Sequence, residues 1–183
     1  MFIRSERLFL RPGWSEDWQE LFAQMAEEGD ARLRSPYTPK VAQRLAALPQ
    51  DRLCPNFLVT LPGVDGARVI GCVGLSATAT GAELGYWIGQ DYWGRGYATE
   101  AARAVLRLAR TLGHRSLQAT HFVDNPASAQ VLCKVGFVPT GQIEQRYSSA
   151  CGGMAPALVY AISLGEPSDC DGGDDAGAAL RAA

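Results

Sequence analysis

The chain has 183 residues, 47% of them hydrophobic, which is enough for one substantial core but short for two independent ones. Its formal charge is only −2 and it carries no lysine-rich stripe, which argues against nucleic acid as the main partner. No apolar run approaches the roughly 18 residues of a membrane span, and no basic, then apolar leader is present, so we expect a cytoplasmic protein with no membrane partner.

The first part of the chain predicts one strand followed by two helices. Alternating apolar residues over 3–10 indicate the strand. Ser15 is placed as the N-cap of the first helix, whose apolar positions recur at helical spacing, at Trp18, Leu21, Phe22 and Met25. Thr38 and Pro39 form a cap and first-turn pair for a second, short helix that reaches Pro49.

The middle of the chain predicts three short strands joined by tight turns, over 57–61, 69–75 and 82–88, which is typical of an antiparallel meander. A long alanine-rich helix over 95–112 follows and stops at Gly113. The remaining elements are a strand over 117–123, a helix over 127–135, and last strands at Val138 and over 159–164. This order predicts a single α/β domain with a mixed sheet flanked by helices.

The C-terminal segment differs from the rest in composition. Residues 166–183 carry five carboxylates against one arginine, so their charge is −4 and that of residues 1–165 is +2. The segment has no apolar periodicity before its last residues, so we expect a domain over 1–165 and a disordered acidic tail over 166–183. The alternative is that Leu180 docks onto the domain or onto a partner.

Five cysteines are scattered along the chain without Cys-x-x-Cys spacing. They are Cys54, Cys72, Cys133, Cys151 and Cys170. An odd, unpatterned set indicates reduced packing residues, and it predicts no metal site.

A glycine-rich turn between the 82–88 strand and the long helix predicts an anion site. Gly94 and Gly96 let the backbone curl, so successive N–H groups and the N-terminus of the next helix can point at one bound group. The turn lacks the Gly-Lys-Ser/Thr ending of a nucleotide-triphosphate loop and the third glycine of a dinucleotide loop. A phosphorylated ligand of another kind is therefore expected.

The motif Trp93-Gly-Arg-Gly96-Tyr-Ala98 is followed about thirty residues later by Asn125-Pro-Ala-Ser128 and then by Lys134-Val-Gly-Phe137. Together with the opening Ser5-Glu-Arg-Leu-Phe-Leu-Arg-Pro12, these motifs resemble the GNAT superfamily of acetyl-CoA-dependent N-acetyltransferases. The resemblance is greatest to the branch that includes ribosomal-protein N-terminal (alanine/serine) acetyltransferases. It covers residues 2–164, nearly the whole chain.

The resemblance implies a fold and a set of residues that bind acetyl-CoA. The fold is the acyl-CoA N-acyltransferase fold, a mostly antiparallel mixed sheet whose central parallel strands splay to admit the pantetheine arm. The residues it assigns to acetyl-CoA binding are Ile88, Trp93, Gly94, Arg95, Gly96, Tyr97, Ala98, Thr99 and Asn125. Trp93 departs from the Arg or Gln that begins the superfamily's usual loop, although a tryptophan is common there in this branch.

Acetyl transfer to an amine must remove protons from the nucleophile and supply one to the thiolate. The resemblance places Glu83, on the strand before the loop, as the base that draws the proton, often through water. From the residues alone, the favoured interpretation of Glu83 is a solvated strand carboxylate. His121 and Asp124 are alternative bases, although a lone histidine on a strand is more often a packing residue.

The tyrosine that many superfamily members use as an acid is replaced here by Leu132. The resembled branch suggests Ser128 instead, in the role of stabilising the departing sulfur. Asn125-Pro-Ala-Ser128 also reads as a helix start, with Asn125 as the cap and Pro126 in the first position, and both readings can hold together.

These observations predict an enzyme that transfers acetyl from acetyl-CoA to a primary amine by direct attack in a ternary complex. The acceptor is either a protein N-terminus or a small-molecule amine, and the chain is a monomer or a homodimer. The alternative is a non-catalytic acyl-CoA-binding or regulatory module that keeps the loop without turnover.

Overall fold

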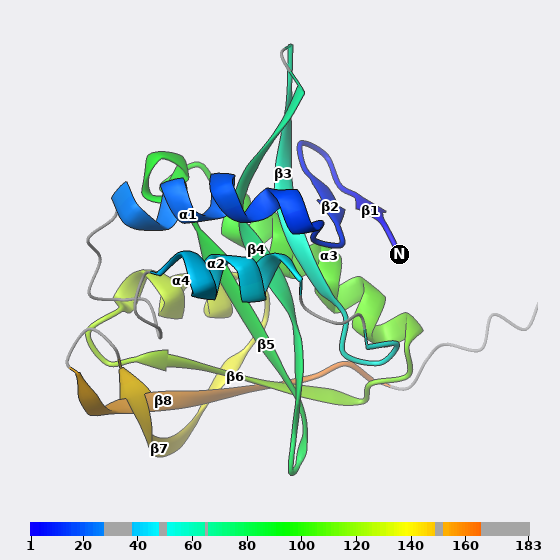
Figure 1. The fold of residues 1–183 in the computed structure, drawn as a ribbon. Coiled ribbons are helices and arrows are strands. Elements are labelled where there is room, and N and C mark those ends of the chain that lie inside the picture. The colour runs from blue at the N-terminus through cyan, green and yellow to red at the C-terminus, as the bar shows by residue number, and fades with distance from the viewer. Residues whose placement is uncertain (28–37, 48–50, 65, 149–151, 166–183) are drawn as a thin grey trace, which may run out of the picture.

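The computed structural model describes residues 1–27, 38–47, 51–64, 66–148 and 152–165 (Figure 1). Within them, an eight-stranded sheet has the order β1-β2-β3-β4-β5-β6-β8-β7. The strands are β1 (Ile3–Arg4), β2 (Phe9–Arg11), β3 (Asn56–Gly63), β4 (Gly66–Thr78), β5 (Gly81–Ile88), β6 (Ser116–Phe122), β7 (Val138–Ser148) and β8 (Gly153–Ser163). The helices are η1 (Ser15–Asp17), α1 (Trp18–Glu27), α2 (Pro39–Ala46), η2 (Gln90–Tyr92), α3 (Tyr97–Thr111) and α4 (Pro126–Lys134).

Strands β5 and β6 form the parallel pair at the centre of this otherwise antiparallel sheet. They pair at a single position, Glu83 with Gln118, whereas β5 pairs with β4 along the whole length of β5. Beyond Glu83 the two strands separate, which opens the sheet at its middle. The predicted mixed α/β fold with splayed central strands is confirmed.

Two helical layers cover the two faces of the sheet. In Figure 1, α1 and α2 cross in front of the sheet and α3 lies behind it. The larger core lies on the α3 face, where the helix buries alanines such as Ala101 and Ala102 against Leu75, Leu84 and Leu117. The core on the other face joins α1 and α2 to the sheet, and its buried members are Leu21, Ala42, Ala46, Leu58 and Val69. Side chains alternate between these faces along each strand.

The N-cap predicted for α2 is the one in the structure, but the N-cap predicted for the first helix is not. Thr38 Oγ1 accepts a hydrogen bond from Val41 N at 3.3 Å, as an N-cap should. The prediction that Ser15 caps the first helix was wrong, because Trp14 is the cap residue and Ser15 lies inside η1. Asp17 explains the shift, since its buried carboxylate accepts from Trp14 N and pairs with both terminal nitrogens of Arg11, each at 2.7 Å.

The observed bounds of several other elements also differ from the predicted ones. The single strand expected over 3–10 is two strands, because Ser5 N donates to Leu8 O at 3.0 Å in a turn between them. The long helix begins two residues later than predicted, after Gly96 in the left-handed conformation. The last part of the sheet is much longer than predicted. The prediction missed most of β7, because this strand is exposed along most of its length and carries little apolar alternation.

The predicted end of the second helix at Pro49 and the predicted tail over 166–183 lie outside the described residues, as does the side chain of Met25. Among the helices that are described, none combines the length and the apolar composition needed to cross a membrane.

Candidate active site

A cavity of about 350 Å³ opens where β5 ends and α3 and α4 begin. Eight of the nine residues predicted to bind acetyl-CoA line it, together with Ser128. These eight are Ile88, Trp93, Gly94, Gly96, Tyr97, Ala98, Thr99 and Asn125. Arg95 and Glu83 do not line it. The volume lies within the range of about 300–1,000 Å³ that is usual for small-molecule sites.

The glycine turn has the backbone conformation that the sequence predicted for it. Gly94 and Gly96 have φ of 71° and 80°, which an L-residue would adopt at a cost of about 1–2 kcal/mol. The first intrahelical bond of α3 runs from Glu100 N to Gly96 O at 3.0 Å, so the N–H groups of residues 97–99 have no acceptor within the helix. Three free donors and the positive end of the helix dipole therefore meet at the cavity wall, as an anion site requires.

The Trp93 side chain links this turn to the sheet through a hydrogen bond. Its Nε1 donates to Ile88 O at 2.6 Å, so the indole bridges the last residue of β5 and the glycine turn. The side chain is still 41% exposed, and it forms part of the cavity wall. A tryptophan at this position thus holds the loop in place, which explains how it can stand where an Arg or Gln is usual.

A second hollow of about 450 Å³ adjoins the cavity and shares Gly96, Thr99 and Lys134 with it. We call this hollow the basic basin, because its charged lining consists of four cationic and two acidic side chains. They are Arg7, Arg103, Arg107, Lys134, Glu6 and Glu100. The basin gives the cavity a positively charged end. Thr99, Arg103 and Arg107 follow one another at intervals of four residues on α3, a spacing that could have identified this face from the sequence.

One ion pair orders the wall between the basin and the glycine turn. Arg7 Nη2 lies 2.7 Å from Glu100 Oε2, and Arg7 Nη1 donates to Arg95 O at 3.0 Å. Burial raises the pKa of the Glu100 carboxyl, but hydrogen bonds from Arg7 and Ser5 outweigh it and leave that pKa below its ordinary value. Glu100 therefore remains charged, and it helps Arg7 to hold the carbonyl that precedes Gly96.

Tyr86 and Ser128 also line the cavity, and neither of them lines the basic basin. Tyr86 Oη donates to the backbone oxygen of Ser128 at 2.9 Å, which links β5 to α4. Burial raises the pKa of Tyr86 to about 12, so its hydroxyl stays protonated. Asn125 Oδ1 accepts from Ser128 N at 3.2 Å, so Asn125 caps α4 and lines the cavity at once. The Ser128 hydroxyl takes part in neither of these bonds.

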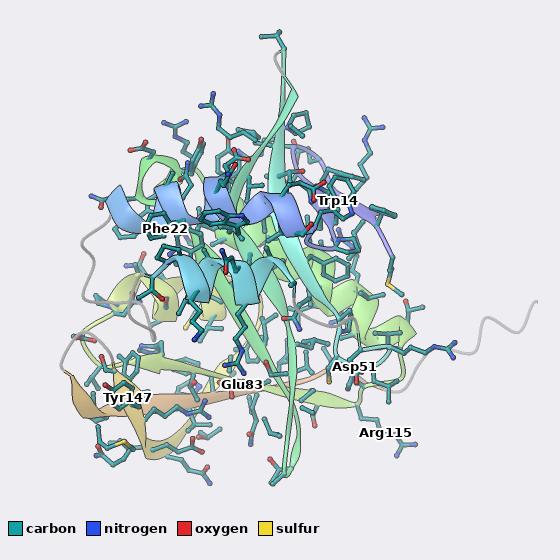
Figure 2. The ribbon with its side chains drawn as sticks, viewed as in Figure 1. Trp14, Phe22, Asp51, Glu83, Arg115 and Tyr147 are labelled. Carbon is teal, nitrogen blue, oxygen red and sulfur yellow. The ribbon has the colours of Figure 1, made fainter. Side chains whose placement is uncertain are left out.

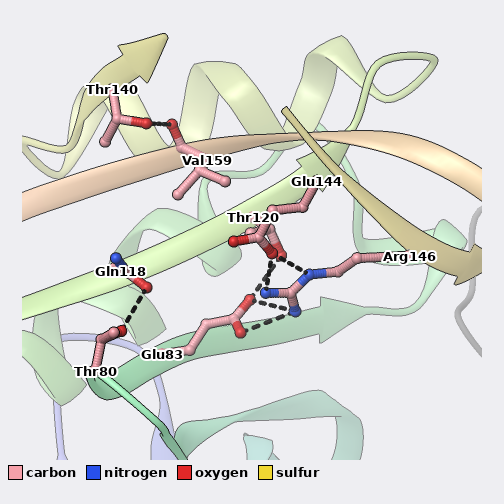
Figure 3. A network of polar contacts seen from close by, with 8 residues as sticks. All are labelled: Thr80, Glu83, Gln118, Thr120, Thr140, Glu144, Arg146 and Val159. Carbon is pink, nitrogen blue, oxygen red and sulfur yellow. Dashed lines mark hydrogen bonds and ion pairs between the residues drawn. The ribbon is translucent and has the colours of Figure 1, made fainter. Parts of the chain in front are cut away.

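Glu83 lies on the other face of the sheet, below α2 and beside β6 in Figure 2. It shares this face with Trp87, which packs against the core of α1 and α2. Only 8% of Glu83 is exposed. Thr120 Oγ1 donates to Glu83 Oε1 at 2.6 Å, and Arg146 Nη1 lies 3.1 Å from Oε1 and 2.9 Å from Oε2 (Figure 3). Both carboxylate oxygens are therefore engaged.

The sequence did not identify Arg146. Its guanidinium also binds Glu144 Oε2 at 2.9 Å, so it bridges two carboxylates. Burial lowers the pKa of Arg146, but the hydrogen bonds to Glu144 and Glu83 raise it above its ordinary value. Arg146 and Glu83 are 63 positions apart in the chain, and no local pattern indicates that they meet.

The other candidate bases differ sharply in environment. Asp124 is exposed, whereas only 5% of His121 is exposed. His121 Nδ1 lies 2.8 Å from Phe122 O, and its Nε2 is buried with no hydrogen-bond partner among the described residues. Its ring lies 5.2 Å from that of Tyr160.

The described cysteines take no part in the cavity wall. Cys54, Cys72 and Cys133 are absent from its lining, and burial raises the pKa of the Cys72 thiol to about 11. Cys151 and Cys170 lie outside the described residues. Over the described ranges, no three His, Cys, Asp or Glu side chains come together in a way that could hold a metal ion.

Residues 7–138 match the acetyltransferase (GNAT) domain family. The uncharacterized N-acetyltransferase YoaA of Bacillus subtilis (strain 168) is 28% identical over 171 residues, which cover 87% of this chain and 95% of YoaA. RimL, a ribosomal L7/L12 alpha-N-protein acetyltransferase solved with coenzyme A, has a TM-score of 0.74 at 20% identity and covers 92% of this chain and 100% of its own. MccE, the microcin C7 self-immunity acetyltransferase solved with acetyl-CoA and AMP, has a TM-score of 0.72 at 16% identity, covering 86% and 93%. The likeness to RimL and MccE is one of fold.

Proposed function

Because the chain belongs to the acetyltransferase (GNAT) domain family and is an acetyl-CoA-dependent N-acetyltransferase, we propose that it acetylates a primary amine by direct attack in a ternary complex. The acceptor amine belongs to a protein N-terminus or to a small molecule. The observation that carries this proposal is the course of the cavity. It runs from the glycine turn at the start of α3, past the end of β5 at Tyr86 and Ile88, to the start of α4 at Asn125 and Ser128.

The two ends of the cavity suit the two ends of acetyl-CoA. The phosphate end is assigned to the N–H groups of residues 97–99 and to the basic basin. There the positive side chains and the helix dipole both attract the negative charge of the phosphates. The pantetheine and thioester end is assigned to the part of the wall formed by Tyr86 and Ser128. When bound, acetyl-CoA supplies the activated acyl carbon, and the chain's residues orient it and manage the protons.

The acceptor amine approaches from the α1 and α2 face, where Glu83 lies. A primary amine with a pKa of about 10.4 is an ammonium ion at neutral pH, so it must first lose a proton. We assign that proton to Glu83 through a bridging water, because Thr120 and Arg146 already occupy both carboxylate oxygens. The negative charge of Glu83 also favours an ammonium ion on this side of the sheet.

The Ser128 hydroxyl is proposed to stabilise the sulfur as negative charge develops on it. Only the backbone atoms of Ser128 make the bonds to Asn125 and Tyr86 described above, so the hydroxyl is available for this role. A direct attack is supported by the cysteines, because none that is described lines the cavity and the Cys72 thiol is held in its protonated, less nucleophilic form.

Release of thiol from acetyl-CoA in the presence of a panel of amines tests this proposal. The panel contains peptides with a free N-terminal alanine or serine, a polyamine and an aminoglycoside, with N-terminally blocked peptides as controls. Release with a primary amine supports the proposal and identifies the acceptor class. Tight binding of acetyl-CoA without release by any amine would instead support the non-catalytic module.

A further inference from the structure

His121 carries a buried nitrogen for which the described part of the chain provides no hydrogen-bond partner. The side chain is 5% exposed, and its Nε2 has no hydrogen-bond partner among the described residues. Buried polar atoms are nearly always hydrogen-bonded, so an unpaired one calls for a specific reason. A group supplied by a bound ligand is one such reason.

The position of His121 on the sheet indicates which ligand group that is. Glu83 and Gln118 are the one paired position of β5 and β6, and three residues further along each strand lie Tyr86 and His121. These two residues therefore stand at the same level, about 10 Å beyond the last pairing, where the strands have separated. Tyr86 lines the cavity, and His121 is at the level of Tyr86 on the neighbouring strand without being part of the lining itself.

Tyr86 and His121 also share a face of the sheet. Leu117 and Ala119 alternate with His121 along β6 and belong to the core beneath α3, and the His121 ring packs beside Tyr160 of the same core. Tyr86 packs against that core as well, and it bonds to Ser128. His121 thus lies on the face that holds Tyr86 and Ser128. Glu83 lies on the opposite face with Trp87, which also lines the cavity.

The hydrogen bond at Nδ1 fixes which nitrogen carries the proton. Phe122 O can only accept, so Nδ1 at 2.8 Å must be the donor. In the neutral ring, Nε2 is then an acceptor with a free lone pair. The protein has oriented the imidazole so that the nitrogen able to take up a proton is the unpaired one.

We propose that His121 is a catalytic residue that carries a proton from the attacking nitrogen to the departing sulfur. The inference rests on the proposed function and extends it. Acylation of an ammonium ion releases two protons from nitrogen, one before the attack and one after it. Glu83 is assigned the first, on the acceptor face, and His121 the second, on the face that holds Tyr86 and Ser128.

The step balances without any further reactant. The neutral amine attacks the thioester carbon and forms the C–N bond, which leaves a positive charge on nitrogen and a negative charge on the carbonyl oxygen. His121 Nε2 takes one N–H proton. As the C–S bond breaks, the electron pair goes to sulfur, and Nε2 returns the proton there to give the thiol and the neutral imidazole. Nitrogen and sulfur are bonded to the same carbon at this stage, so one imidazole can serve both.

This assignment fills the acid role that Leu132 leaves vacant. Leu132 is 1% exposed in the core and has no group that could donate a proton. A serine hydroxyl can hydrogen-bond to sulfur but is a poor proton donor, so Ser128 by itself leaves the thiolate unprotonated. His121 supplies the missing proton transfer.

The variant His121→Asn tests the inference, because its amide keeps a donor for Phe122 O and has no proton to exchange. His114→Asn is the matched control, since His114 is the chain's other histidine and bonds to Leu53 O at 2.7 Å, away from the cavity. We expect His121→Asn to lower kcat by about 10²–10⁴-fold with the Kd for acetyl-CoA unchanged, and His114→Asn to leave both unchanged. A wild-type kcat in His121→Asn would overturn the inference.

A spectroscopic measurement on the wild-type protein decides the inference even where a variant fails to fold. In protein labelled with ¹⁵N-histidine, we expect the His121 Nε2 resonance to be that of an unprotonated nitrogen and to shift when coenzyme A binds. The His114 resonances provide the internal reference. An unmoved Nε2 resonance at a coenzyme A concentration that saturates the protein would overturn the inference. Failure of the proposed function can be told apart from failure of this inference, because the wild-type protein would then release no thiol from acetyl-CoA with any amine.

Discussion

Arg146 Nη1 lies 2.9 Å from Glu83 Oε2, an ion pair that reaches from β7 to β5. The side chains are 28% and 10% exposed, so the pair is shielded from water on the Glu83 side. Because Thr120 donates to the same carboxylate, Glu83 is held in one orientation beside the opening between β5 and β6. Arg146 is thus a positioning residue for the carboxylate that we assign to the acceptor face.

Arg146→Ala should destabilise the fold by about 1–3 kcal/mol, because it leaves the nearly buried Glu83 carboxylate without its cationic partner. Urea unfolding measures this cost. In the double variant with Glu83→Gln, the cost of Arg146→Ala should shrink, since no unpaired charge remains. The control is Glu144→Gln, which removes the more exposed partner of Arg146 and should cost no more than about 0.5 kcal/mol. Equal costs of Arg146→Ala with and without Glu83 would contradict the coupling.

Glu83→Gln keeps the size of the side chain and removes its ability to take up a proton. We expect kcat to fall by about 10²–10⁴-fold while the Kd for acetyl-CoA stays unchanged. Part of the rate should return at high pH, where more of an amine with a pKa of about 10.4 is already neutral. A wild-type rate across the whole pH profile would show that Glu83 is structural and that the first proton leaves by another route.

Gly96→Val should weaken acetyl-CoA binding, because a branched side chain at φ 80° strains the turn at the cavity wall. Gly113→Val is the matched control, since Gly113 has φ 86° and follows the other end of α3. Both variants should lose similar stability in thermal unfolding, and only Gly96→Val should lose affinity in calorimetry. Unchanged affinity in folded Gly96→Val would remove the glycine turn from the binding site.

Ser128→Ala and Asn125→Ala should separate chemistry from capping. Ser128→Ala leaves the backbone bonds to Asn125 and Tyr86 intact, so we expect a modest loss of kcat with stability and acetyl-CoA affinity preserved. Asn125→Ala removes the cap of α4 and should cost about 0.5–2 kcal/mol in unfolding experiments. If Ser128→Ala affects only acetyl-CoA binding, the role at sulfur is refuted.

The features of the site that sequence analysis identified are those whose physical cause is local. The turn around Gly94 and Gly96 needs positive φ, and Asn125 caps the helix that it precedes, so neighbouring residues reveal both. The contacts of Glu83 with Arg146 and of Tyr86 with Ser128 join positions 63 and 42 apart, and only the sheet brings them together. The cap prediction at Ser15 failed for a different reason: Arg11 and Asp17, six positions apart, form an ion pair across the turn, and this pair sets the helix start.

The extent of β7 could not be predicted either. A strand is recognised by apolar alternation, and β7 is exposed over nearly all of its length, including Val138 and Ile143, each 62% exposed. Its antiparallel pairing with β8 forms the strand, and that pairing involves no sequence pattern of β7 itself. Arg146 lies on this strand, which is why the sequence did not associate it with the site.

The most direct test of the central claim follows the acetyl group itself. Intact-mass spectrometry of protein, amine and acetyl-CoA within a single turnover should show one acetyl group on the amine and none on the protein at any time. This is the result of direct attack by an amine on acetyl-CoA held in the cavity. An acetylated protein that forms and decays at the rate of product formation, or no acetylated amine from any member of the panel, would contradict the account.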